Sequence, residues 1–251
     1  MGNLIIKGKG GAGNKLILQD QAGAAVLTTA DSGATIANAT LDSNVIHTGG
    51  GGLKSMQVIT STATWTRPAN ITRIKVYVTG GGGGGGGGTT VDKGAGGGAG
   101  GTAIEIIDVT SISSVTATVG TGGAGGGASV TGTSGVTSSF GSHCSATGGV
   151  GGRFGNAGAA YGGAGGVATG GNLNIHGGMG NNGQDNTFDS AYESSFGLGG
   201  SSFWGGGARG GSDLTAAATA LCFGTGGGGG IEDSTQASAG APGVIVVEEY
   251  S

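Results

Sequence analysis

The sequence predicts an all-β protein: a small β-sandwich with packed polyglycine II tracts, preceded by a short fibre-like β segment. Glycine makes up 67 of 251 residues, yet only 2 prolines occur, so the Gly-X-Y composition of collagen is absent. Short runs of alternating apolar and polar residues separate the glycine tracts. Charged residues make up only 10% and mean hydropathy is +0.10, which is too apolar for a typical disordered chain.

The first segment, residues 1–52, reads as three short strands. The runs "NLIIKGK", "NKLILQD" and "AAVLTTAD" are separated by "GGAG" and "QAG", and Leu16 and Leu18 would share a strand face. So short a segment buries too little apolar surface to be stable alone, so we expect residues 1–50 to assemble the chain into a homotrimer. The run of glycines at 49–52 is a hinge, and residues 53–251 form the second domain.

The second domain opens with an expected strand segment. In "MQVITSTATWT", residues 56–66, Met56, Val58 and Thr60 share one face. Pro68 and Asn70 then make a turn, because proline fixes φ and asparagine tolerates left-handed geometry.

The remaining strands show the same alternation or a continuous apolar run. Residues 71–79 place Ile74, Val76 and Val78 inward and Arg73, Lys75 and Tyr77 outward. Ile104 and Ile106 fall on one face of 102–110, and Val115, Ala117 and Val119 on one face of 113–120. Val244 to Val247 form an unbroken apolar run, which predicts a strand covered on both faces.

Glycine tracts connect these strands. A polyproline II helix has three residues per turn and leaves every N–H and C=O free to pair sideways. We therefore predict a bundle in which glycine lets neighbouring backbones approach and lateral hydrogen bonds offset the entropic cost, with Gly80, Gly84, Gly88, Gly205 and Gly226 as structural positions. A flexible linker is the alternative. The tracts are 80–88, 94–101, 120–127, 148–152, 162–166, 197–200, 205–211 and 226–230.

Charge and motifs exclude several function classes. A net charge of −4 without a basic stripe disfavours nucleic acid as a partner, and no apolar run is long enough for membrane insertion. The N-terminus predicts neither a signal peptide nor myristoylation. The GxGxxG matches head no helix, and Walker, HExxH and GxSxG motifs are missing, so we expect no enzyme and no cofactor.

The histidines and cysteines predict no chemical site. His47, His143 and His176 are widely separated and lack neighbours at metal-ligand spacing, so we expect no metal. "GGSD" and "GQD" do not repeat as a calcium-binding nonapeptide would. Cys144 and Cys222 could form one disulfide, but two buried thiols are the favoured reading.

Aromatic residues gather between positions 188 and 204. Phe203 and Trp204 are expected to close the end of the glycine bundle as a small core, which is what the resemblance of "SSFWGGG" to glycine-rich domains of phage fibre proteins implies. Phe188, Asp189, Tyr192 and Glu193 are expected to lie on an exposed loop and contact a receptor, since aromatic side chains are enriched at binding hot spots.

Several segments together resemble the glycine-rich domain of bacteriophage tail-fibre and receptor-binding proteins. They recur in order over roughly residues 56–251: "TWTRPANITRIKVYVTGGGGGGGG", "GNLNIHGGMGNNG", "GGSSFWGGGARGG", "GTGGGGG" and "GAPGVIVVEEY". The design is also similar to polyglycine-bundle adhesins at the tips of phage long tail fibres. Residues 1–50 resemble trimeric phage fibre segments more loosely, and "NNGQDNTFDSAYESSFG" is longer and more aromatic than the family pattern.

The resemblance implies a structural protein on the virion surface that acts as a receptor-binding adhesin. Its implied partners are copies of itself, other fibre, baseplate or capsid proteins, and a bacterial protein or polysaccharide receptor. A capsid head fibre or decoration protein is one alternative. An extracellular ice-binding polyglycine protein is another, although its flat face requires short side chains at every third position, and the tracts read as uneven.

Overall fold

The chain divides into two compact units, Met1–Gly50 and Gly51–Ser251. The computed structural model describes residues 17–19, 25–30, 33–36, 52–89, 92–155, 160–183, 197–211, 216–231 and 236–251. Throughout these ranges the regular structure is β, as predicted. In the first unit, β1 (Ile17–Gln19), β2 (Ala25–Ala30) and β3 (Gly33–Ile36) form an antiparallel sheet in the order β1-β2-β3.

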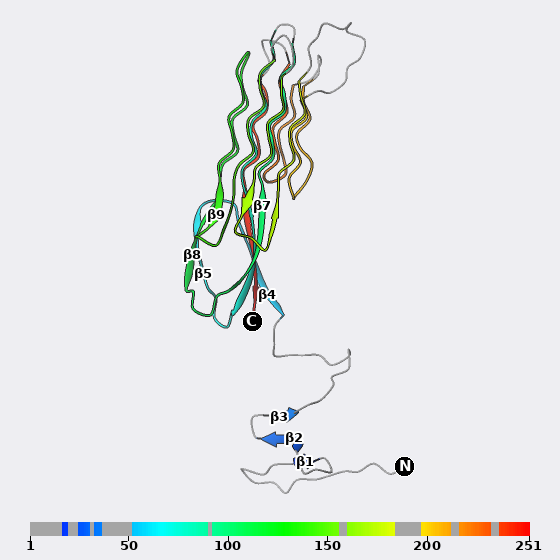
Figure 1. Cartoon of the computed structure of the whole chain (residues 1–251). Helices are drawn as coiled ribbons and strands as arrows, with labels where there is room; N and C mark the ends of the chain where they lie inside the picture. The colour runs from blue at the N-terminus through cyan, green and yellow to red at the C-terminus, as the bar shows by residue number, and fades with distance from the viewer. Residues whose placement is uncertain are drawn as a thin grey trace, which may run out of the picture. The chain divides into compact units, whose positions relative to one another are not determined.

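The second unit contains two antiparallel five-stranded sheets, which form the predicted sandwich (Figure 1). One has the strand order β11-β10-β9-β8-β5 and the other β12-β7-β6-β13-β4. The strands are β4 (Leu53–Ile59), β5 (Ala63–Thr66), β6 (Arg73–Thr79), β7 (Thr102–Asp108), β8 (Ser114–Thr118), β9 (Ser138–Phe140), β10 (Cys144–Ala146), β11 (Ala168–Thr169), β12 (Leu173–Ile175) and β13 (Val244–Tyr250).

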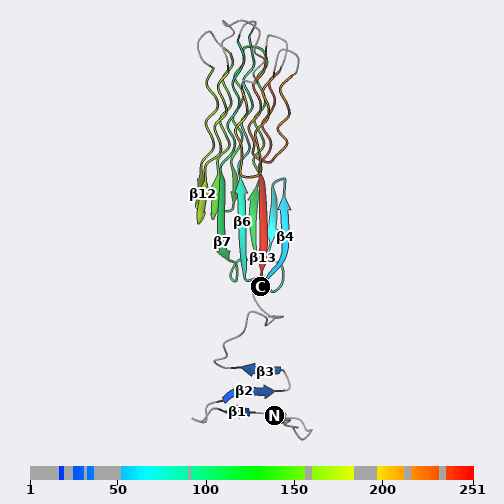
Figure 2. The ribbon, with the colours of Figure 1, turned by 90° about the vertical axis from the view of Figure 1, so that its right-hand side faces the viewer.

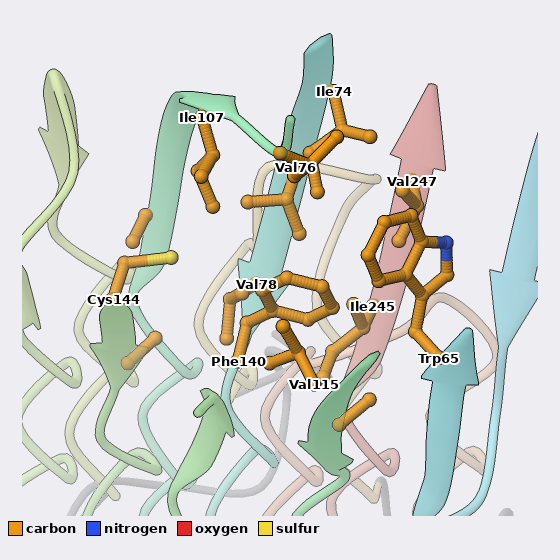
Figure 3. Close-up of a cluster of buried hydrophobic side chains, with 14 of the residues drawn as sticks. Trp65, Ile74, Val76, Val78, Ile107, Val115, Phe140, Cys144, Ile245 and Val247 are labelled. Atoms are coloured by element: carbon orange, nitrogen blue, oxygen red, sulfur yellow. The ribbon is translucent and has the colours of Figure 1, made fainter. Parts of the chain in front are cut away.

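The hydrophobic core lies between the two sheets (Figure 3). Ile74, Val76 and Val78 are fully buried there, which confirms the inward face predicted for β6. Val115 and Ala117 of β8 are buried as well, and Val119 packs against the cluster. Trp65 and Phe140 fill its centre, with ring centroids 5.9 Å apart.

Two further local predictions are confirmed. Asn70, in the turn after Pro68, has φ of 65°, the left-handed conformation expected from its sequence context. In β13, all four residues from Val244 to Val247 are buried, because β6 and β4 flank the strand and side chains cover both of its faces. Met56 and Val58, and likewise Ile104 and Ile106, do share a face, but it is the outer face of the sheet: Met56, Val58 and Ile106 are more than half exposed.

Beyond the sheets, the glycine tracts run side by side as extended, wave-like segments (Figure 2). The tract that follows β6, residues 80–88, is buried along its whole length. From Gly81 to Gly87, every backbone N–H donates to a carbonyl oxygen of another tract, with N···O distances of 2.8–3.0 Å. The tract is therefore held laterally at every residue and is not a flexible linker.

The hydrogen bonds of this tract repeat every third residue, as a three-residue helical turn requires. Gly83 and Gly86 donate to Gly98 and Ala95, while the next residues along, Gly84 and Gly87, donate to Thr133 and Val130. The third series runs from Gly82 and Gly85 to Ala241 and Ser238. The carbonyl oxygens of the tract accept hydrogen bonds at the same three-residue interval from three other segments: 149–155, 123–126 and 227–230. Residues 80–88 thus lie at the centre of a polyglycine II lattice, as predicted.

Glycine is required in this lattice because neighbouring backbones occupy the space of a side chain. A Cβ at Gly80 would lie 2.3 Å from Thr147 O, and one at Gly84 2.0 Å from Ala124 O. At Gly226 the nearest atom, Gly97 O, would be 2.0 Å away. Gly88 is buried, and its carbonyl accepts from Ser129 N at 2.9 Å.

The position of Gly205 differs from these predicted lattice glycines. It forms a bridge with Ser202, and a Cβ there would meet the Cys222 sulfur at 2.5 Å rather than a tract backbone. Gly205 therefore belongs to a side turn, and the adjacent tract enters the lattice only at Gly207, where a Cβ would lie 1.8 Å from Gly199 O.

The lattice also includes tracts that contain little glycine. Residues 130–136 and 236–241 accept hydrogen bonds from the central tract and donate to other tracts, although neither segment reads as a glycine run. In the first of them Gly132 and Gly135, three residues apart, face the central tract. The side chains of Val130, Thr133 and Val136 point in directions other than toward the central tract, and both valines are about half exposed. A tract on the surface of the bundle therefore needs glycine only on the sides that meet neighbours.

Candidate functional site

The end of the bundle remote from the sheets is the first candidate site. There the central tract turns back, with Thr89 N donating to Asp92 O at 2.8 Å and Asp92 N donating to Thr89 Oγ1 at 3.0 Å. Gly155 and Ser129, from two other tracts, donate to Gly87 O and Gly88 O beside this turn. We call this end of the bundle, defined by Thr89, Asp92, Ser129 and Gly155, the tip.

The two tract ends that flank the predicted receptor loop also lie near the tip. Gly183 N donates to Ala160 O at 2.9 Å, and a Cβ at Gly183 would lie 2.0 Å from Lys93 O, one residue after Asp92. Gly197 N donates to Asn182 O at 3.1 Å. Phe188, Asp189, Tyr192 and Glu193 themselves lie outside the described residues. Their flanking tract ends are anchored in the lattice at one location.

An aromatic cluster on the outer face of the β6 sheet is the second candidate site. Phe203 and Trp204 form a tight turn, and both rings pack on Tyr77, with centroids 6.1 and 6.0 Å away. Trp204 Nε1 donates to Thr79 Oγ1 at 2.9 Å, and Phe203 is 46% exposed. The expectation that these two residues close the end of the bundle as a small core is wrong, because the turn folds over the sheet instead.

Beside this cluster lies an apolar groove of about 370 Å³. Val244 and Val246 of β13 line it together with Met56 and Val58 of the edge strand β4 and the rings of Tyr77, Phe203, Trp204 and Phe223. A groove of this composition fits apolar groups of a protein partner better than a sugar or an ion, which need converging polar groups. Among the residues that line it, the sequence predicted only Tyr77 to point outward, from the alternation in residues 71–79.

Charged and hydroxyl side chains lie on the same face of the sheet, closer to the end of the chain. The Glu248 carboxylate accepts from Tyr250 Oη at 2.7 Å and from Tyr77 Oη at 3.2 Å. The hydrogen bond with Glu248 raises the pKa of Tyr250, and the hydrogen bond with Tyr77 raises the pKa of Lys75. The Lys75 ammonium also lies 4.8 Å from the Tyr77 ring centroid. Lys75 is therefore charged at neutral pH and lies next to an acceptor.

The adjacent residue, Glu249, points the other way and is buried, with 1% of its surface exposed. Its carboxylate accepts from Trp65 Nε1 at 2.8 Å, from Gln57 Nε2 at 2.7 Å and from Ser55 Oγ. These three donors satisfy the carboxylate where no water reaches it. Glu249 thus ties β4, β5 and β13 together, and its role is structural.

Both cysteines are free, in agreement with the favoured reading of two unpaired thiols. Cys144 is buried, and burial, helped by the nearby Glu105 carboxylate, raises the pKa of its thiol from 9.0 to about 12. Cys222 is only half-buried.

We predict that alkylating agents modify Cys222 in the folded protein, while Cys144 reacts only after unfolding, because only an accessible thiolate is nucleophilic.

The raised pKa of Cys144 also lowers the stability of the fold above pH 9. There the Cys144 thiol of the unfolded chain loses its proton while that of the folded chain retains it. Denaturant titrations from pH 8 to 11 should show a smaller fall in stability for Cys144→Ala than for wild type. An equal fall in both proteins would contradict the assignment.

The described residues give no support for other chemistry. Among them, His143 and His176 belong to no group of three or more residues that could hold a metal ion, while His47 lies outside the described ranges. Nor do the described ranges include a helix long and apolar enough to cross a membrane.

Comparison with known proteins agrees with the architecture. The model of a family described as "Glycine-rich domain" matches residues 57–250, which cover the whole lattice and both sheets except for the first half of β4. No curated protein matches the sequence at a significant level. Because this family model spans most of the chain, the protein belongs to the glycine-rich domain family.

Proposed function

We propose that the protein is a structural fibre protein on the surface of a bacteriophage virion, and that its glycine-rich head is an adhesin that binds the bacterial host. The observation that carries the proposal is the tip. The central tract of the lattice is hydrogen-bonded at every residue. At the tip, this lattice ends in turns and tract ends that lie together, among them Gly183 and Gly197. Binding loops are disproportionately presented in this way, on a rigid scaffold.

In this proposal, residues 1–50 trimerise the chain and join it to other fibre, baseplate or capsid proteins. The segment between Gly183 and Gly197 contributes Phe188, Asp189, Tyr192 and Glu193 to receptor contact. The receptor is a protein or a polysaccharide of the bacterial surface. A fibre on the capsid head would use the same scaffold, and imaging of labelled protein on intact virions distinguishes the two positions.

The test is adsorption of the purified protein to a panel of bacterial cells. Replacement of both Phe188 and Tyr192 by alanine is expected to reduce binding to the host strain about tenfold or more, the size of a hot-spot loss. Leu221→Ala is the control, because Leu221 is 89% exposed and lies next to Cys222, at the end of the bundle that joins the sheets. Unchanged adsorption by the double variant would remove the loop from the binding site, and failure to bind any cell would contradict the adhesin proposal.

One observation favours ice binding as a second candidate. On the flank of the bundle, adjacent tracts place short side chains at every third position: Thr133 and Val136, Thr147 and Val150, and Ala164 and Val167. The three valines are 42% to 51% exposed, so this flank is more regular than the sequence suggested. Thermal hysteresis in a solution of the purified protein would support this candidate, and its absence would eliminate it.

A further inference from the structure

The outer face of the β12-β7-β6-β13-β4 sheet exposes an unusual number of large apolar side chains. Met56, Val58, Ile106 and Leu173 are each between 53% and 57% exposed, and they come from three different strands. Monomeric proteins rarely expose contiguous apolar patches of this kind, and larger ones mark interaction sites.

The strand register arranges this face in rows. One row crosses all five strands and is entirely apolar or aromatic: Leu173, Ile104, Tyr77, Val246 and Val58. The next row has opposite charges at its centre and apolar residues at its ends: Ile106, Lys75, Glu248 and Met56. Lys75 and Glu248 are direct cross-strand partners, on the two central long strands of the sheet.

We propose that a second copy of this chain stacks on this face, about a two-fold axis that runs parallel to the strands between β6 and β13. Such an axis exchanges the two sides of each row. Lys75 then faces the partner's Glu248, and Glu248 faces the partner's Lys75. Ile106 faces the partner's Met56, and Ile104 faces the partner's Val58. A face of this kind is self-complementary, as an isologous interface requires.

The area of the face is sufficient for such a contact. Four strands of seven residues cover roughly 20 by 25 Å at ordinary strand spacing and rise. Two copies together would bury about 1,000 Å², the size at which specific protein interfaces begin. The exposed Phe203 ring beside the groove adds to the contact.

This inference is independent of the proposed function. An axis parallel to the strands leaves both glycine bundles pointing in the same direction, so each copy keeps its tip free. If residues 1–50 trimerise the chain, each trimer carries three such faces, and the face contact links trimers; otherwise it pairs two single chains. In both cases, loss of the face contact lowers the mass in solution to that of the unlinked unit, one trimer or one chain.

A charge exchange tests the pairing directly. Light scattering of the full chain at micromolar concentration should give a mass above that of the unlinked unit, which is one chain of 23.3 kDa or one trimer. Lys75→Glu, which places two carboxylates opposite each other, should lower the mass to that of the unlinked unit and raise the dissociation constant about tenfold or more. The double variant Lys75→Glu/Glu248→Lys should restore the wild-type mass, because both charges move together.

An apolar variant and its control complete the experiment. Val58→Glu should also lower the mass to that of the unlinked unit, whereas Val136→Glu should not, because Val136 is 51% exposed in the tract that leads into β9 of the other sheet. Far-UV circular dichroism melts confirm that each variant is folded. Equal masses for wild type, Lys75→Glu and Val58→Glu would overturn the proposal, as would a double variant that fails to regain the wild-type mass.

Discussion

Gly84→Ala is expected to disrupt the lattice and destabilise the second unit by about 3 kcal/mol or more. The new Cβ would lie 2.0 Å from Ala124 O and 2.4 Å from Ala124 C, both backbone atoms held by their own hydrogen bonds. No rotamer change relieves such a contact, so the tract must move and lose several of its lateral hydrogen bonds. Denaturant unfolding followed by circular dichroism measures the loss.

Gly127→Ala is the matched control for this variant. A Cβ at Gly127 meets nothing within 4 Å, and its backbone conformation is not left-handed. Alanine there restricts the unfolded chain without strain in the folded one, so stability should be unchanged or rise by up to about 1 kcal/mol.

Amide exchange in the wild-type protein tests the lattice in a second way. The backbone N–H groups of Gly81 to Gly87 should exchange slowly, because each is buried and hydrogen-bonded. Random-coil exchange at these positions would contradict the lattice.

The second large effect is expected from Glu249→Leu, which should cost about 3 kcal/mol or more. The Trp65 indole N–H, 1% exposed, loses its acceptor and cannot reach water. Ser55 and Gln57 lose the same partner but lie closer to solvent, where water replaces it. Most of the cost therefore comes from Trp65.

The neighbouring residue provides the comparison for Glu249. Glu248→Leu removes an acceptor from the Tyr77 and Tyr250 hydroxyls on the outer face, which water can reach when the faces are unpaired, so at protein concentrations too low for pairing its cost should stay below about 1 kcal/mol. Thermal melts of the two variants side by side give the difference. Equal destabilisation would show that the buried carboxylate has no special role.

If both Glu249→Leu and a Trp65→Phe variant are made, their effects should not add. Each removes one end of the same hydrogen bond, so the double variant should lose less than the sum of the two single losses. Additive losses would place the contribution of Glu249 in its bonds to Ser55 and Gln57 instead.

The sequence by itself determined the segments that form β4 to β8 and β13, and the centre of the lattice, whereas it did not predict the short strands β9 to β12. Alternation in residues 73–79 predicted which side chains enter the core, since a strand turns successive residues to opposite faces. The unbroken glycine run at 80–88 predicted a tract enclosed on all sides, because only glycine leaves room for neighbours in every direction. The tip could be predicted only as a loop rich in aromatic residues, and Phe188 and Tyr192 lie outside the described residues.

Only the tertiary structure decided which other segments join the lattice and where the aromatic turn lies. Residues 130–136 contain two glycines, yet they belong to the bundle, because a surface tract needs glycine only on its inward side. Phe203 and Trp204 could not be placed from their neighbours in sequence, since the partner that positions them, Tyr77, is more than a hundred residues away in the chain. Local pattern fixes the direction of a side chain relative to its own backbone, whereas the surface that it meets depends on which distant segments pack alongside.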